Sequence, residues 1–138
     1  MELHVTPAPV RRAMLASRSH RVLVVDDDAD AAEELAAALH DRGHTVATAY
    51  TGQAAVAVAA VFRPRLILVD LFMPLVSGRE VVACLRGIAE IGTPTIVAVS
   101  GAAPHVARER AAAAGFDGCL ERPFRPAAVE RLISDAAA

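Results

Sequence analysis

The chain has 138 residues, of which 54% are hydrophobic, a formal net charge of −2 and an isoelectric point near 6.2. This length fits one domain that buries about two-thirds of the surface its unfolded chain would expose. The charge excludes a general attraction to nucleic acid or to an anionic membrane, and no apolar run is long enough to span a membrane.

Residues 1–20 contain prolines and arginines without a sustained apolar stretch. This composition favours a flexible N-terminal extension over a secretory signal, so we expect the folded domain to cover residues 21–138. Cys84 and Cys119 are the only cysteines and have no CxxC spacing, which is typical of reduced thiols in a cytoplasmic protein. The chain has 14 arginines and no lysine.

From residue 21 onward the chain alternates strand and helix patterns. Short runs rich in Val, Ile and Leu predict strands buried on both faces, at 21–25, 45–48, 66–69, 95–99 and 118–121. Helical patterns with stop signals predict helices at about 29–42, 52–62, 79–87, 104–115 and 126 to the C-terminus. Five strand–helix units predict an α/β fold, a three-layer sandwich with right-handed crossovers.

Acidic residues follow two of the predicted strands. Asp26 and Asp27 come directly after the first strand, and Asp70 comes after the third. Residues just past parallel strands lie at the carboxyl edge of the sheet, where open α/β folds hold their ligands. Three carboxylates at this edge repel one another and predict a site for Mg²⁺ or Mn²⁺. Ser100 follows the fourth strand and Arg122 the fifth, which adds a hydroxyl and a cation able to bind a phosphoryl group.

Four motifs at these strand ends, in this order, resemble the receiver domain of bacterial response regulators. The resemblance covers residues 21 to about 136. The motifs are Val24-Val25-Asp26-Asp27-Asp28, Leu68-Val69-Asp70-Leu71-Phe72-Met73-Pro74 with Gly78, Val99-Ser100-Gly101, and Arg122-Pro123-Phe124.

The resemblance implies a flavodoxin-like five-stranded parallel sheet in the order 2-1-3-4-5 with five helices. It implies that Asp70 accepts a phosphoryl group from a histidine kinase or a histidine phosphotransfer protein. The remaining implied roles are magnesium ligation by Asp26, Asp27, Asp70 and the backbone carbonyl of Phe72, a switch hydroxyl on Ser100, and a cis peptide bond before Pro123.

Two residues at the predicted site differ from the family pattern. Arg122 stands where the family usually has lysine; arginine keeps the charge but is longer and planar. It is expected to pair with the phosphoryl group, with pairing to Glu121 or pointing away as alternatives. Cys119 stands where the family often has an aromatic residue that moves with the switch hydroxyl, so we expect altered coupling and an inert thiol rather than a redox site.

Two apolar residues flank the expected path of a water molecule attacking an aspartyl phosphate. Phe72 lies two positions past Asp70, and Ala102 two positions past Ser100. One hypothesis is that Phe72 excludes this water and lengthens the phosphorylated state; the alternative is that it only covers the loop.

The predicted function is a stand-alone phosphoacceptor switch rather than an enzyme. Its output is expected through another protein, on the face made by the fourth helix, the fifth strand and the fifth helix, without direct binding to nucleic acid or membrane. An alternative is a degenerate receiver that acts as an interaction module without phosphorylation. A phosphatase of the haloacid dehalogenase type is disfavoured, because Phe72 occupies the place of that family's second aspartate.

Other polar residues receive less specific interpretations. The five histidines show no metal-ligand spacing and are expected to be solvated or to cap helices. Arg108, Glu109 and Arg110 are expected to form a solvated helix face, with a partner surface as the alternative.

Overall fold

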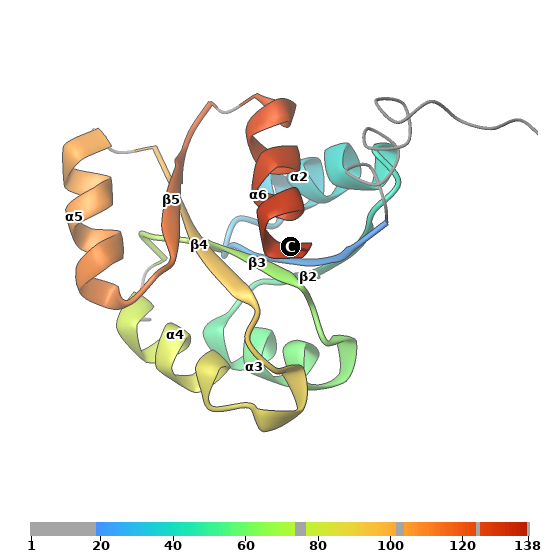
Figure 1. Ribbon diagram of the computed structural model, residues 1–138. Helices are drawn as coiled ribbons and strands as arrows, with labels where there is room; N and C mark the ends of the chain where they lie inside the picture. The colour runs from blue at the N-terminus through green and yellow to red at the C-terminus, as the bar shows by residue number, and fades with distance from the viewer. Residues whose placement is uncertain (1–18, 74–76, 102–103, 124, 138) are drawn as a thin grey trace, which may run out of the picture.

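Five parallel strands form one central sheet in the computed structural model, in the order β2-β1-β3-β4-β5 (Figure 1). The strands are Arg21–Val25 (β1), Thr45–Ala49 (β2), Leu66–Asp70 (β3), Thr95–Ser100 (β4) and Gly118–Glu121 (β5). This is the predicted order, so the flavodoxin-like fold is confirmed. The structure describes residues 19–73, 77–101, 104–123 and 125–137. The expectation of a flexible segment at 1–20 therefore falls mostly outside the described residues and stays a prediction.

Helices cover both faces of this sheet, as a three-layer sandwich requires (Figure 1). They are α2 (Ala29–Asp41), α3 (Gly52–Phe62), α4 (Gly78–Arg86), α5 (Pro104–Ala114) and α6 (Pro126–Ala137). α2 and α6 pack on one face, and α3, α4 and α5 pack on the other. All five predicted helices are present, and a short 3-10 helix at Ala89–Ile91, η1, was not predicted.

The sheet separates two apolar layers, and β1 shows how one strand serves both. Val22 and Val24 pack in the layer under α2 and α6, whereas Leu23 and Val25 pack in the layer under α3, α4 and α5. All four are at most 2% exposed. Successive side chains of a strand point to opposite faces, so a run of apolar residues is needed where both faces are covered.

Side-chain caps set where α2 and α3 begin. The Asp28 side chain accepts hydrogen bonds from the backbone N–H groups of Asp30 and Ala31, at 3.1 and 3.2 Å. Thr51 accepts one from the N–H of Ala54 at 3.0 Å. Because the first N–H groups of a helix have no intrahelical partner, such caps stabilise the start of the helix. α2 thus begins directly after the acidic run that follows β1.

His44 is buried, so the expectation of solvated or capping histidines is wrong for this residue. Its Nδ1 accepts a hydrogen bond from the backbone N–H of His20 at 3.2 Å. The ring hydrogen is therefore on Nε2, which lies 3.0 Å from a carboxylate oxygen of Glu130 and donates to it. This pair joins the start of β2 to α6, at the amino end of the sheet.

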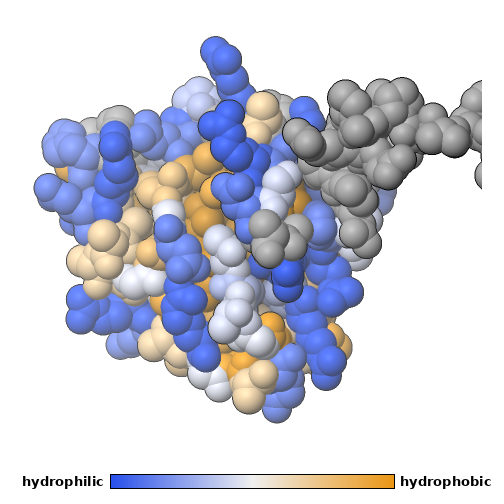
Figure 2. Space-filling view, viewed as in Figure 1, coloured by the Kyte–Doolittle hydropathy of each residue, from blue (hydrophilic) through white to orange (hydrophobic). Residues whose placement is uncertain are grey.

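The outer surface mixes hydrophilic and hydrophobic residues. On the face seen in Figure 2, rows of hydrophilic side chains alternate with smaller hydrophobic areas. Within the residues that the structure describes, no helix has the length and apolar character needed to cross a membrane.

Candidate functional site

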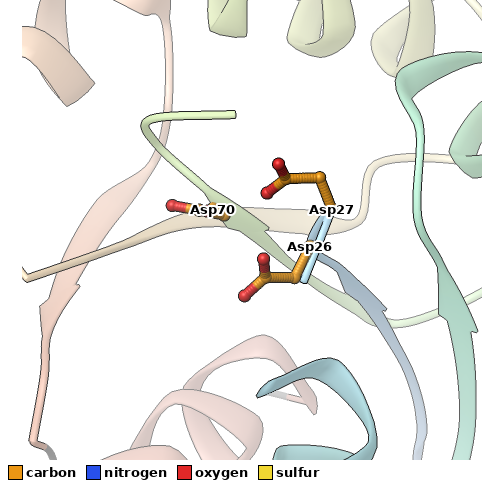
Figure 3. Close-up of side chains that lie close together, drawn as sticks. All are labelled: Asp26, Asp27 and Asp70. Carbon is orange, nitrogen blue, oxygen red and sulfur yellow. The ribbon is translucent and has the colours of Figure 1, made fainter. Parts of the chain in front are cut away.

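Three aspartates lie together at the carboxyl edge of the sheet (Figure 3). The register aligns Val25 with Val69, so the residues that follow them, Asp26 just past β1 and Asp70 at the end of β3, lie side by side. Asp26, Asp27 and Asp70 each offer a carboxylate oxygen within 4.8 Å of the others. Asp26 is buried, Asp70 is half-buried and Asp27 is exposed. The carboxylates predicted from the strand ends are therefore close enough to share one ion.

The spacing of these oxygens suits a small divalent cation. Oxygen ligands lie about 2.0–2.1 Å from Mg²⁺, so two ligands of one ion are at most about 4.2 Å apart. Oxygens already within 4.8 Å of one another need only a small adjustment to reach this spacing. A set made only of oxygen donors also matches the preference of Mg²⁺ and Mn²⁺. The donor set fits such an ion.

Both carboxylate oxygens of Asp26 already have hydrogen-bond partners. The backbone N–H of Asp28 donates to Oδ1 at 3.0 Å, and Arg122 donates from Nη2 to Oδ2 at 2.7 Å. The Asp26 side chain is 2% exposed and that of Arg122 is 37% exposed. Arg122 thus neutralises the most buried carboxylate of the cluster. It neither points away nor pairs with Glu121, the two alternatives that its sequence position left open.

Burial, a hydrogen bond and neighbouring charges together shift the pKa of Asp70. The backbone N–H of Phe72 donates to its Oδ1 at 3.1 Å. Burial raises the pKa of the Asp70 carboxyl above its usual value, the hydrogen bond from Phe72 opposes this, and the charge of Asp26 raises the pKa further. Arg122 lowers it in part. The net upward shift shows that the metal-free site disfavours a charge on Asp70.

Ser100 and Arg122 are joined through their backbones at the ends of β4 and β5. Ser100 is fully buried, and its carbonyl accepts a hydrogen bond from the backbone N–H of Arg122 at 2.7 Å. The peptide bond between Arg122 and Pro123 is cis. This geometry brings the predicted switch hydroxyl and the predicted cation to the edge that carries the aspartates.

Cys119 lies in β5, opposite Ala98 of β4, and is partly buried. Burial is the main cause that raises the pKa of its thiol, the charge of Glu121 adds to the shift, and Arg108 opposes it. A raised pKa reduces the thiolate fraction, which is the reactive form. The inert interpretation of this cysteine therefore has structural support.

Phe72 contacts a residue that the sequence did not connect to the site. Its side chain is 40% exposed, and the guanidinium carbon of Arg110 lies 5.0 Å from the centre of its ring. A cation at this distance over an aromatic face is attracted by the ring. Arg110 belongs to α5, so the contact joins the loop after β3 to that helix. Ala102, the other residue predicted to control water access, lies outside the described residues.

Comparisons with known proteins agree with this fold. Residues 22–134 match the family model described as the response regulator receiver domain. A response regulator receiver protein of Anaeromyxobacter sp. (strain Fw109-5) is 41% identical over 113 residues, which are 82% of this chain and 45% of that protein. The chain spans about half the length of the curated relatives it matches.

Two solved structures have the same architecture. A signal receiver domain from Bermanella marisrubri is 32% identical, with a TM-score of 0.74 over 88% of this chain and 100% of the other. The chemotaxis protein CheY4 of Vibrio cholerae is 27% identical, with a TM-score of 0.75 over 86% of this chain and 99% of the other.

Proposed function

Because the chain belongs to the response regulator receiver domain family, we propose that it is a switch that accepts a phosphoryl group on Asp70 in the presence of Mg²⁺ or Mn²⁺. The observation that carries the proposal is the group of three carboxylate oxygens, from Asp26, Asp27 and Asp70, within 4.8 Å of one another. A sheet edge with one such cluster, a buried serine and an arginine offers each type of group that phosphoryl transfer to a carboxylate requires.

The proposed ion ligands are the carboxylates of Asp26, Asp27 and Asp70 and the backbone carbonyl of Phe72. When bound, a divalent cation neutralises the carboxylate cluster and the charge of a transferring phosphoryl group. Each Asp26 oxygen accepts one hydrogen bond in the metal-free site and keeps a second lone pair with which it could ligate the ion.

Asp70 is the proposed nucleophile. One of its carboxylate oxygens attacks phosphorus, and the bond from phosphorus to the nitrogen of a phosphohistidine, or to the oxygen of an acyl phosphate, breaks. The leaving group takes the electron pair, and a leaving histidine also takes a proton from solvent. Ser100 would donate its hydroxyl hydrogen to a phosphoryl oxygen, and Arg122 would pair with another after leaving Asp26.

The proposed donor is a histidine kinase or a histidine phosphotransfer protein, since receiver domains interact with these proteins. The proposed output face consists of α5, β5 and α6, which are the predicted fourth helix, fifth strand and fifth helix. β5 links the proposed site to the output face, because Arg122 of the site follows this strand and Cys119 lies within it.

Intact-protein mass spectrometry tests the proposal directly. The purified chain is incubated with Mg²⁺ and a small acyl phosphate, and we expect the mass of one phosphoryl group to be added. Asp70→Asn should abolish this adduct, and Asp41→Asn, which changes an exposed aspartate at the end of α2, should leave it intact. The absence of an adduct with any donor, a cognate kinase included, would favour the phosphorylation-independent interaction module. Multiple turnover of a phosphomonoester would instead favour the phosphatase.

A further inference from the structure

We propose that Arg110 is a positioning residue that responds to phosphorylation of Asp70 by leaving the ring of Phe72, and that this movement transmits the phosphorylation to α5. The inference rests on the proposed phosphorylation of Asp70 and adds a route by which that event reaches the output face. Its starting point is the contact between the Arg110 guanidinium and the Phe72 ring, with 5.0 Å between the guanidinium carbon and the ring centre.

Phe72 is tied to the phosphoacceptor through its backbone. Its N–H donates to Oδ1 of Asp70 at 3.1 Å, so the position of the ring depends on what Asp70 binds. In Figure 3 the Asp70 carboxylate points away from the end of β1, toward the side of the sheet edge on which β5 lies. Helix α5 packs against β5 and β4 on this same side. A charge added to Asp70 therefore appears on the side of the edge that faces Arg110's helix.

Arg110 lies on the flank of α5. Ala107 and Ala111 form the buried side of this helix, and Arg110, next to Ala111, is exposed. Among the described residues it forms no ion pair with a carboxylate, and its guanidinium lies over the Phe72 ring. A cation over an exposed aromatic ring is held weakly, whereas a charge-assisted hydrogen bond between arginine and a phosphoryl oxygen is strong. Phosphorylation of Asp70 offers Arg110 the stronger partner.

The carboxyl end of α5 is fastened to α4. Arg79 donates to the carbonyl oxygen of Ala113 at 2.8 Å, and Arg86 donates to that of Gly115 at 3.0 Å. A pull on Arg110 toward the site would therefore tilt α5 about its fastened end rather than translate it. Cys119 cannot supply an aromatic side chain in β5, whereas the ring of Phe72 with Arg110 provides an aromatic contact between the site and the output face.

Hydrogen exchange of the α5 amides, measured with and without phosphorylation by Mg²⁺ and an acyl phosphate, tests the proposal. In the wild type we expect exchange in residues 107–113 to change on phosphorylation. Arg110→Gln should still take the phosphoryl adduct, but the change in α5 exchange should fall at least fivefold. Arg110→Lys, which keeps the charge, should restore half or more of it. Arg108→Gln removes the same charge from the same helix and should respond as the wild type does.

A second variant tests the role of the ring. Phe72→Leu keeps an apolar side chain but removes the aromatic face, so α5 of the unphosphorylated variant should already exchange faster than in the wild type. A phosphorylated Arg110→Gln protein with the full wild-type change in α5 would overturn the inference while leaving the proposed function intact. A wild-type chain that takes no phosphoryl adduct would instead remove the proposed function, and the inference with it.

Discussion

Replacing Arg122 by glutamine should increase the affinity of the metal-free protein for Mg²⁺. In the structure the guanidinium of Arg122 donates to Oδ2 of Asp26 at 2.7 Å, and the N–H of Asp28 occupies the other oxygen. Arg122 therefore acts as an internal cation that competes for a proposed metal ligand. Glutamine keeps part of the stem but removes the charge.

The size of the effect follows from the exposure of the pair. A hydrogen bond between charged groups contributes about 1.5–3 kcal/mol net. The Arg122 side chain is 37% exposed, so screening by water reduces this to about 1 kcal/mol. Loss of a competitor worth about 1 kcal/mol lowers the dissociation constant for Mg²⁺ about fivefold.

Isothermal titration calorimetry with Mg²⁺ at fixed ionic strength measures this constant. Arg125→Gln is the matched control, because it removes the same charge from an exposed position shortly after β5 and should leave the affinity near the wild-type value. Asp26→Asn should weaken binding strongly if the titration reports this site. An Arg122→Gln protein that binds Mg²⁺ as weakly as the wild type, or more weakly, would refute the competition between arginine and metal.

Four further predictions address stability and turnover. In metal-free buffer Asp70→Asn should increase the free energy of unfolding at pH 7, because the pKa of Asp70 is raised in the folded state and its ionisation destabilises the fold as pH rises through that pKa. Urea titrations should show no such increase below the usual pKa of an aspartate. An equal increase at pH 7 and below the usual pKa would contradict this prediction. Asp28→Ala should lower the unfolding free energy by about 1 kcal/mol through loss of the α2 cap, and an unchanged urea midpoint would argue against the cap. Ile133→Ala should lower the unfolding free energy by about 2–5 kcal/mol, because Ile133 is fully buried. Val61 is 86% exposed, so Val61→Ala should lower it by about 0.5 kcal/mol or less. Similar losses for the two variants would be inconsistent with the described core. Phe72→Asn should speed loss of the phosphoryl group from isolated phosphorylated protein, and equal rates would remove the idea that the ring excludes water.

The acidic half of the site was predictable from the sequence alone. Parallel strands end at one edge of a sheet, so residues at or just past the ends of β1 and β3 lie close together wherever those strands are neighbours. Asp26 and Asp70 needed only the two apolar runs before them to be placed. The same reasoning brought Ser100 and Arg122 to this edge, because both positions are set by backbone periodicity.

Contacts made by long side chains were not predictable in the same way. Arg122 reaches an aspartate 96 positions earlier in the chain, and its own neighbour Glu121 offered an equally plausible acceptor from sequence. The contact of Arg110 with Phe72 depends on how α5 lies across the loop after β3. His44 is buried where α6 brings Glu130 to it, and no local sequence pattern predicts this contact. Tertiary geometry selects among partners that sequence spacing leaves equivalent.

Two backbone amides make this site readable by nuclear magnetic resonance. The N–H of Asp28 is bonded to Asp26, and the N–H of Phe72 is bonded to Asp70. Each proton therefore senses one carboxylate of the proposed ion site, the first that of Asp26 and the second that of Asp70. In a ¹⁵N-labelled sample, a titration with Mg²⁺ alone would move both resonances, because both carboxylates are proposed ligands. Modification of Asp70 in the Mg²⁺-saturated protein would then be followed at the Phe72 resonance, so two successive titrations of one sample distinguish ion binding from phosphorylation.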